Sequence, residues 1–471
     1  MKKVKWLAFL LAGGLLAAGC SGGQAGADSQ AAESTAAQTE AGESGGSETA
    51  AAPELPADPE AKSQALAGML VEGDFAGVAA VFSPELQESL NAESLQAGWE
   101  QTVASAGAFE EYYGTEEENG GALCHSLLRY QDGGIRVSFT YNDTGLLEGI
   151  WISSYNIPDE LTANETLQEV AITIPFTSNG EEYQLDGVLT LPVGVEKPPV
   201  AILIQGSGQS DYNETLSGNR PFQDLAWGLA ERGIASIRYN KRYYQFPGQA
   251  PANLTISDEV LEDAATAIAL AGELDSVNGE AIFLIGHSLG GMLAPEIARE
   301  NPAVRGLVSL AGSPRHLADI LYDQNEDALN QMGNLSEEQK EASLESLRQM
   351  VESAKAAADL EDAQMLLNVP MSYWASLNAM DTAEAARELT IPMLFLQGTA
   401  DFQVKMETDF AAWQQALEGH SNAQFQSYEG LNHLFMPTNG KMDASEYETP
   451  GQVDSRVIGD IAAFIQGNAE T

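Results

Sequence analysis

The stretch Ile285–Gly291 reads IGHSLGG, and it decides how the rest of the chain is interpreted. It follows the apolar run 281–285, which predicts a buried strand, and it leads into the segment 288–300, which has the apolar spacing of a helix. A G-x-S-x-G pattern between a strand and a helix predicts a sharp turn that presents Ser288 in a strained conformation. The two glycines of the pattern permit the close backbone approach that such a turn needs.

Strands and helices alternate on both sides of this turn. Strands are expected at 170–175, 183–191, 200–205, 235–239, 281–285, 304–311, 392–397 and 423–428, and helices at 221–232, 258–274 and 288–300. The first two strands read as an antiparallel pair around Asn179-Gly180. The remaining alternation predicts an α/β fold with a mostly parallel sheet and helices on both of its faces, over residues 165–471.

Two further residues have the chemistry to activate Ser288. A serine nucleophile needs a base, and the base needs a group that orients it. Asp401 follows the expected strand 392–397, and His433 follows the expected strand 423–428. Functional loops of a parallel sheet gather at the carboxyl ends of the strands. We therefore expect Ser288, His433 and Asp401 to act as nucleophile, base and orienting acid.

The other candidates for these roles are less well placed. The chain has five histidines. His287 is adjacent to the nucleophile and is expected to face away from it, whereas His316 and His420 follow no predicted strand, and His125 belongs to another domain. The rival acids are a pair in the segment after Asp401, Glu407 and Asp409, and both fall in a predicted helix.

The tetrahedral intermediate of acyl transfer needs two N–H donors. One is expected at Leu289, directly after the nucleophile, where a helix begins. The other is expected in the loop that follows the strand 200–205, with Ser207 preferred and Gly206 and Gly208 as close alternatives. A plain glycine-rich turn stays open as the alternative for each single residue.

Five motifs in order carry a family resemblance: IQGSGQSD at 204–211, RYNKR at 238–242, GHSLGG at 286–291, QGTAD at 397–401 and GLNH at 430–433. Together they resemble secreted bacterial α/β-hydrolases of the carboxylesterase type, related to the prolyl-oligopeptidase and dienelactone-hydrolase branches. The resemblance extends over about Leu167–Gly467 and implies cleavage of short acyl esters without a cofactor or metal. Two positions depart from the family pattern. Gln205 replaces a usual His, and Asn240 replaces a usual Asp, so a salt bridge to Lys241 or Arg242 is expected to be missing.

The segment from about 313 to 389 is an insertion between two expected core strands, and it is rich in Ala, Glu, Leu and Gln. Insertions at this place usually form a helical cap over the active site. Four of its large side chains either line an acyl pocket or form the core of the cap, and the core is favoured: Met365, Leu366, Tyr373 and Trp374.

The amino-terminal 20 residues have the organisation of a secretory signal. Three lysines precede the apolar run 6–16, and small residues end at Cys20. The run is too short for a membrane span, which needs about 20 apolar residues. The end resembles the lipobox of bacterial lipoproteins, which implies diacylglycerol on Cys20 and an extracytoplasmic protein anchored to the membrane by lipid. An ordinary cleaved signal with an incidental cysteine is the alternative.

Residues 21–57 contain almost nothing large and apolar, and they are expected to form a disordered tether. Residues 58–156 then show helical spacing followed by four short strand-like runs, which predicts a small α+β domain. Its apolar spacing resembles a cystatin-like or NTF2-like domain. We expect His125 to be structural there, and Cys124 to be a buried, unpaired thiol.

The formal net charge of −47 leaves few cations to bind phosphates, which argues against a nucleic-acid partner. A solubilising acidic surface is favoured over an acidic site for a cationic substrate. The expected partners are a small ester substrate and the membrane, through Cys20. Two other functions stay open: a serine peptidase acting on small peptides, and a non-catalytic binding lipoprotein. Acyl length and oligomeric state are not given by the sequence.

Overall fold

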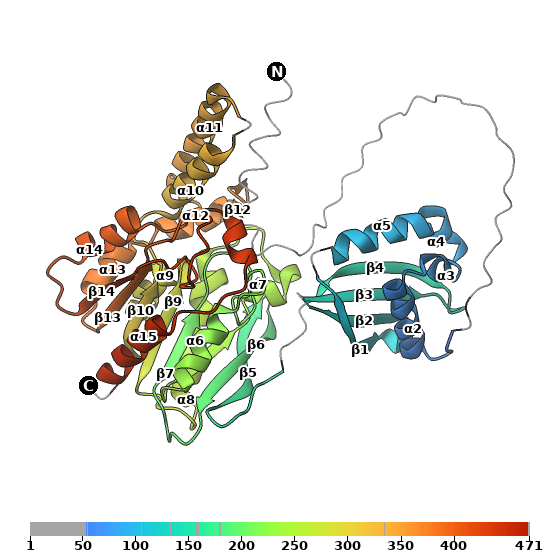
Figure 1. The fold of residues 1–471 in the computed structure, drawn as a ribbon, viewed down its shortest axis with the longest axis horizontal. Coiled ribbons are helices and arrows are strands. Elements are labelled where there is room, and N and C mark those ends of the chain that lie inside the picture. The colour runs from blue at the N-terminus through green and yellow to red at the C-terminus, as the bar shows by residue number, and fades with distance from the viewer. Residues whose placement is uncertain are drawn as a thin grey trace. The chain divides into compact units, whose positions relative to one another are not determined.

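The computed structural model describes residues 53, 55–104, 106–131, 133–155, 160–178, 180–333 and 335–469. Within them the chain divides into two compact units, with the division between Glu160 and Leu161 (Figure 1). The expected signal segment 1–20, with Cys20, and almost all of the expected tether 21–57 lie outside the described residues.

The first unit has helices followed by an antiparallel sheet. Its helices are α2 (Pro59–Glu72), α3 (Phe75–Ala79), α4 (Pro84–Ser89) and α5 (Ala92–Val103). Its strands β1 (Phe109–Glu118), β2 (Leu123–Tyr130), β3 (Gly133–Tyr141) and β4 (Leu147–Tyr155) pair in chain order. The core joins apolar residues of the helices to one face of the sheet, among them Leu70, Trp99 and Phe139. The α+β prediction for this unit is therefore confirmed.

Two residues of this unit were expected to be structural. Cys124 is fully buried and is a free thiol. His125 is also buried, and its Nδ1 lies 2.7 Å from the hydroxyl of Ser138 on the neighbouring strand. A buried histidine that has a hydrogen-bond partner within the sheet fits the structural role.

The second unit is built on an eight-stranded sheet with the order β14-β13-β10-β9-β7-β8-β6-β5. The strands are β5 (Leu167–Ser178), β6 (Glu181–Pro192), β7 (Val200–Ile204), β8 (Ala235–Tyr239), β9 (Ile282–His287), β10 (Val304–Leu310), β13 (Met393–Gly398) and β14 (Ala423–Tyr428). The strands β14, β13, β10, β9, β7 and β8 are parallel to their neighbours in this order, whereas β6 and β5 form the antiparallel edge. The predicted α/β fold with a mostly parallel sheet is confirmed.

Helices cover both faces of this sheet because successive strand residues point to opposite sides. On one face Leu203 and Ile285 pack in the cluster that contains α6 (Pro221–Ala230) and α15 (Ser455–Asn468). On the other face Ile202 and Leu284 pack in the cluster that contains α8 (Glu262–Glu273) and α9 (Leu289–Glu300). A single π-helical turn at Ser257–Leu261 precedes α8, where the sequence had predicted one continuous helix.

The insertion between β10 and β13 contains α10 (Leu317–Gln331), α11 (Glu337–Lys355), α12 (Met371–Asn378) and α13 (Thr382–Glu388). Figure 1 shows α10, α11 and α12 grouped at one end of the sheet. There, α10 lies against the loop after β13, because Gln324 donates to the carbonyl of Gln403 at 3.0 Å and Asp327 pairs with Lys405. The insertion is thus held at the carboxyl end of β13.

The large side chains of the insertion differ in burial. Tyr373 and Trp374 are almost fully buried, and the indole of Trp374 donates to the carbonyl of Leu366 at 2.9 Å. Met365 is 61% exposed. The two aromatic residues belong to the core, as was favoured from the sequence.

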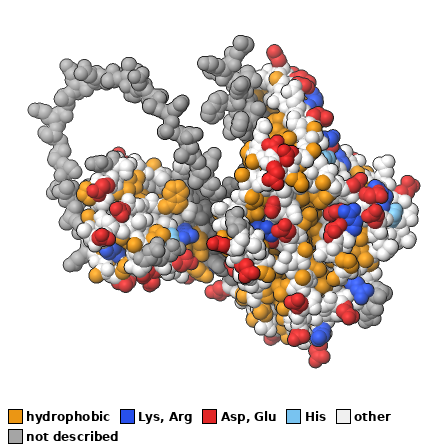
Figure 2. Space-filling model, turned by 180° about the vertical axis from the view of Figure 1, so that it is seen from behind, with side chains coloured by type: hydrophobic (Ala, Val, Ile, Leu, Met, Phe, Trp, Pro, Cys, Tyr) orange, Lys and Arg blue, Asp and Glu red, His pale blue; other side chains and the backbone are white. Residues whose placement is uncertain are grey.

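The surface reflects the acidic composition. Figure 2 shows Asp and Glu side chains spread over the visible face of both units rather than gathered in one patch. Among the described residues, no helix is both long and apolar enough to cross a membrane, and no cluster of three or more His, Cys, Asp or Glu is arranged to hold a metal ion.

Candidate active site

Ser288 occupies a strained turn between β9 and α9. Its backbone has φ 52° and ψ −114°, a conformation that a residue with a side chain rarely adopts. A Cβ at Gly286 would lie 2.2 Å from the carbonyl of Gly290, and a Cβ at Gly290 would lie 2.2 Å from the carbonyl of Ile204. Only glycine fits at both positions, so the sharp turn predicted from the sequence is present.

His433 and Asp401 are brought together from the loops after β14 and β13. The imidazole Nδ1 of His433 lies 2.7 Å from Oδ2 of Asp401, and both side chains are buried. The carboxylate therefore accepts a hydrogen bond from Nδ1–H, which keeps that proton on Nδ1 and leaves Nε2 without a proton and able to accept one. The two side chains are thus in contact, and their roles as base and orienting acid stay predictions.

Asp401 is itself held by three further donors. Its Oδ1 accepts from the backbone N–H groups of Gln403 and Val404 at 2.8 and 3.0 Å. Its Oδ2 also accepts from the side-chain amide of Gln397 at 2.9 Å. Gln397 is buried within β13, and although it opens the motif QGTAD, its role was not predicted, because the motif does not show which group its amide binds. The four bonds fix the position of the carboxylate.

The rival residues have other partners. Asp409 accepts from the hydroxyl of Ser313 at 2.7 Å and pairs with Arg315 at 3.1 Å, which ties the turn after β13 to the insertion. His316 contacts Asn378 through Nε2 and accepts from the backbone of the helix that it caps. Both residues serve the structure of the insertion.

The loop after β7 lies beside Ser288. A Cβ added at Gly206 would lie 3.1 Å from Cβ and 3.6 Å from Oγ of Ser288. Ser288 and the expected oxyanion loop are therefore adjacent, and Ser207 is exposed in that loop. The loop has the place that an oxyanion donor requires, and the roles of Ser207 and Leu289 as donors stay predictions.

Lys241 orients this loop from behind. Its Nζ donates to the carbonyls of Gly206 and Gly208 at 2.6 and 2.7 Å, and to the carboxylate of Glu259 at 2.7 Å. All three ammonium protons thus have acceptors in a buried site. In a trans peptide the N–H and the preceding C=O point in opposite directions. Because Gly206 C=O points at Lys241, the N–H of Ser207 points away from it.

The departure at Asn240 removes no ion pair here. Asn240 accepts from the backbone N–H of Tyr212 at 2.8 Å. Lys241 pairs with Glu259, and Arg242 pairs with Asp263 at 2.7 Å, so both cations find carboxylates on the segment that leads into α8. Position 240 itself supplies no carboxylate to Lys241 or Arg242, and acids from a different part of the chain pair with both cations.

Each ring nitrogen of His287 lies near an oxygen atom of another residue. Its Nε2 lies 3.0 Å from the backbone carbonyl of His433, and its Nδ1 lies 3.0 Å from Oε2 of Glu214. The rings of His287 and His433 are 4.7 Å apart, so the base lies beside the residue that precedes Ser288. The bond between Ser288 Oγ and His433 stays a prediction.

Comparisons with known proteins agree with this architecture. A family model described as serine aminopeptidase, S33, matches residues 218–438. Esterase EstD from Thermotoga maritima is 32% identical over 403 residues, which are 84% of this chain and 92% of that protein. The chain belongs to this α/β-hydrolase family. A model described as a protein of unknown function (DUF3887) matches residues 63–150, within the first unit.

Solved structures of other α/β-hydrolases align more loosely. Est1E from Butyrivibrio proteoclasticus is 18% identical with a TM-score of 0.40, and the match covers 63% of this chain and 99% of that one. A dienelactone hydrolase from Anabaena variabilis is 15% identical with a TM-score of 0.37, and the match covers 65% of this chain and 100% of that one. Similarity at this level says nothing about the substrate of this α/β-hydrolase.

Proposed function

We propose that the chain is a serine esterase that cleaves short-chain carboxylic esters through Ser288, His433 and Asp401. The observation that carries the proposal is the 2.7 Å contact between His433 and Asp401, beside a serine at φ 52°. The relative that aligns over 84% of this chain, EstD, is named an esterase.

In the proposed mechanism His433 Nε2 takes the proton of Ser288 Oγ while Oγ attacks the ester carbonyl. Asp401 keeps the proton of His433 on Nδ1 and stabilises the imidazolium that forms. The imidazolium then gives its proton to the leaving alcohol, and a water molecule, activated by the same base, hydrolyses the acyl-enzyme. Each step uses side chains of this chain alone.

The backbone amides of Leu289 and Ser207 would stabilise the oxyanion of the tetrahedral intermediate. Two features support this assignment. Leu289 is the first residue of α9, whose unpaired N–H groups and dipole favour a negative charge. Lys241 turns the Gly206 carbonyl away, which leaves the opposite side of that peptide for the intermediate.

The test is a series of p-nitrophenyl esters from acetate to laurate, assayed beside aminoacyl and peptidyl p-nitroanilides, with wild type and Ser288→Ala. We expect the highest kcat/KM on acetate to butyrate and no turnover above background by the variant. Faster turnover of the anilides would favour the second candidate, a peptidase of small peptides, to which the family model's description points.

We also propose that the protein is a lipoprotein anchored outside the cytoplasm through Cys20. The support is the sequence alone: a basic segment, an apolar run of 11 residues and small residues before the cysteine. The test is membrane fractionation of cells that express wild type or Cys20→Ser. Wild type should be recovered with membranes and carry a diacylglycerol mass on the mature amino terminus. Recovery of wild type in the soluble fraction would contradict the anchor.

The third possibility, a binding lipoprotein without catalysis, is decided by the nucleophile. It would be supported if a fluorophosphonate failed to label Ser288 in the folded wild-type protein.

A further inference from the structure

A largely buried carboxylate lies next to Ser288 and has no place in the mechanism above. Glu214 belongs to the loop between β7 and α6, where its backbone has φ 53°. The loop is held by Asp211, whose carboxylate accepts from the backbone and hydroxyl of Thr215 at 2.9 and 2.7 Å. Glu214 is thus fixed in an unfavourable backbone conformation that directs its side chain toward the sharp turn at Ser288.

One carboxylate oxygen of Glu214 contacts its own loop after β7, and the other contacts the end of β9. Oε1 accepts from the backbone N–H of Gly206 at 2.5 Å, and Oε2 lies 3.0 Å from Nδ1 of His287. The side chains of Glu214 and His287 are only 12% and 7% exposed. The contact with His287 lacks ideal hydrogen-bond alignment, so its attraction is mainly electrostatic.

The protonation state of His287 follows from its partners. One ring nitrogen faces a carboxylate and the other faces the carbonyl of His433 at 3.0 Å. A neutral imidazole has one N–H and one lone pair, so it would point a lone pair at one of these oxygens. In the imidazolium, Nε2–H can donate to the His433 carbonyl while the positive ring stays 3.0 Å from the Glu214 carboxylate. His316 is the contrasting case, because one of its nitrogens faces an N–H donor and the ring is satisfied when neutral.

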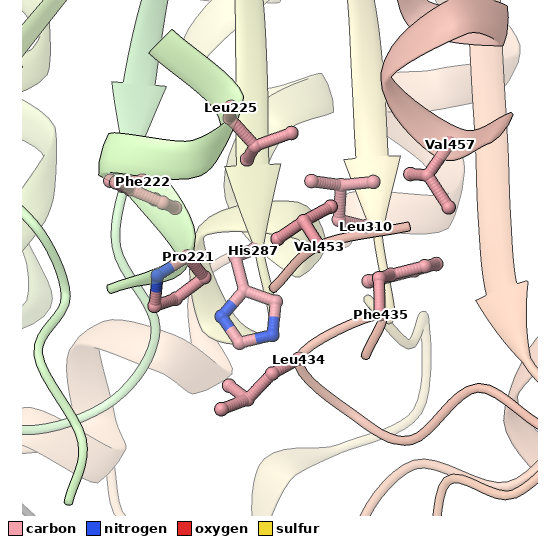
Figure 3. Close-up of a pocket in the computed structure, with 9 residues that line it drawn as sticks. All are labelled: Pro221, Phe222, Leu225, His287, Leu310, Leu434, Phe435, Val453 and Val457. Atoms are coloured by element: carbon pink, nitrogen blue, oxygen red, sulfur yellow. The ribbon is translucent and has the colours of Figure 1, made fainter. Parts of the chain in front are cut away.

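Because most side chains around His287 are apolar, a positive charge on its ring depends mainly on Glu214. Figure 3 shows the ring among apolar side chains of α6, β10 and the loop after β14, where it lines a small cavity with Phe222, Leu434 and Phe435. The charged groups that face it are Glu214 and Asp401. Burial lowers the pKa of His287, but the charge of Glu214, with the His433 carbonyl and Asp401, raises that pKa above its ordinary value.

We propose that Glu214 and His287 form a buried ion pair that positions the oxyanion loop and the base loop around Ser288. The contacts run without interruption from Gly206 N–H through Glu214 and His287 to the backbone carbonyl of His433. They join three loops that come from separate strands. Both are positioning residues, and the inference rests on the proposed esterase function for its kinetic consequences only.

The pair makes activity and stability depend on pH in a defined direction. The raised pKa of His287 means that the ion pair is complete below the ordinary histidine pKa and is lost as the pH rises through the raised value. Loss of the proton turns a lone pair toward one of the two oxygens and releases one loop. The turnover rate should therefore fall on the alkaline side.

The first test reads the protonation state without catalysis. The full chain, labelled with ¹⁵N-histidine, is titrated by NMR, and His287 is assigned by comparison with His287→Asn. We expect the pKa of His287 to lie above the ordinary histidine value, with both ring nitrogens protonated below it. A pKa of His287 at or below the ordinary value would overturn the proposal, even if Ser288→Ala confirmed the esterase.

The second test compares Glu214→Gln with Glu196→Gln, the same substitution at an exposed position of the same unit. Glutamine keeps an acceptor for Gly206 N–H but loses the charge. Because small misplacements of reacting groups are costly, Glu214→Gln should lower kcat about 10-fold with little change in KM.

The same variant should move the alkaline limb of the kcat profile to lower pH, and His287→Asn should remove that limb. Glu196→Gln should match wild type in both respects. A profile of Glu214→Gln that matches wild type would overturn the proposal. If Glu214→Gln fails to fold by circular dichroism, the NMR titration of wild type still decides.

Discussion

Replacing Asp401 with Asn is the sharpest probe of the base, because the structure specifies how every bond would change. The side-chain oxygen of Asn would stay with the two backbone N–H groups, of Gln403 and Val404, that now bind Oδ1. The NH₂ group would then replace Oδ2, which at present accepts from Gln397 at 2.9 Å and from His433 at 2.7 Å. Two donors would face each other at Gln397, and His433 Nδ1 would have to become an acceptor.

Each change has an expected size. Gln397 Nε2 keeps the carbonyls of Val404 and Gly398 as acceptors at 2.9 and 3.3 Å, so the NH₂ group introduced at position 401 is the donor that loses its partner, at a cost of about 1 kcal/mol of stability. The forced tautomer puts the proton on Nε2, where His433 cannot accept one from Ser288. By the general behaviour of Ser-His-Asp triads, kcat should fall by about 10⁴-fold. Initial rates on p-nitrophenyl butyrate and a thermal melt measure the two effects separately.

Asp409→Asn is the matched control, because Asp409 is equally buried and binds Ser313, Arg315 and the backbone of Lys405. It should lower the melting temperature while kcat stays within about 3-fold of wild type, since surface and structural changes away from the reacting atoms leave the barrier unchanged. A kcat of Asp401→Asn within about 10-fold of wild type, or a larger loss in Asp409→Asn, would refute the assignment of the acid.

Three further substitutions, one of them with a matched control, test the architecture around the site. Gly290→Ala adds a Cβ that would lie 2.2 Å from a backbone oxygen, so the soluble yield or the melting temperature should fall sharply. A melting temperature equal to that of wild type would contradict the geometry of the turn at Ser288. Lys241→Met leaves Glu259 buried without its cation, which should cost about 3–5 kcal/mol in chemical denaturation; unchanged stability would show that the ammonium is dispensable. Trp374→Ala should cost about 3–5 kcal/mol because the side chain is fully buried, whereas Met365→Ala, at a largely exposed position, should cost almost nothing; equal effects would contradict the assignment of Trp374 to the core.

The parts of the site that could be predicted from the sequence are those that depend on local geometry. Ser288 was found because a strand, a serine between glycines and a helix follow one another directly. Asp401 and His433 were proposed because each follows an expected strand, and the carboxyl ends of parallel strands meet at one edge. The structure brings these two side chains together, and their catalytic roles stay predictions.

The unpredicted parts depend on which distant segments meet. Gln397 supports Asp401 from within a strand whose apolar pattern gives no sign of it. Lys241 was noticed within a motif, but its bonds to the loop after β7 and to Glu259 require the packing of α8 against the sheet. Glu214 lies in a loop with no regular pattern, so only the folded chain reveals its contact with His287.

The large side chains of the insertion show the same limit. Helical spacing indicates that Tyr373 and Trp374 face something apolar, but a pocket and a core produce the same spacing. The structure buries both residues in the core of the second unit.

The central claim is that Ser288 forms the acyl-enzyme. The most direct measurement is to treat the wild-type protein with a fluorophosphonate at low excess and to locate the adduct by peptide mass spectrometry. We predict one adduct per chain, on Ser288, with loss of esterase activity in proportion to labelling, and neither label nor turnover in Ser288→Ala. An adduct on another residue, or a Ser288→Ala variant that hydrolyses p-nitrophenyl butyrate at the wild-type rate, would contradict the account.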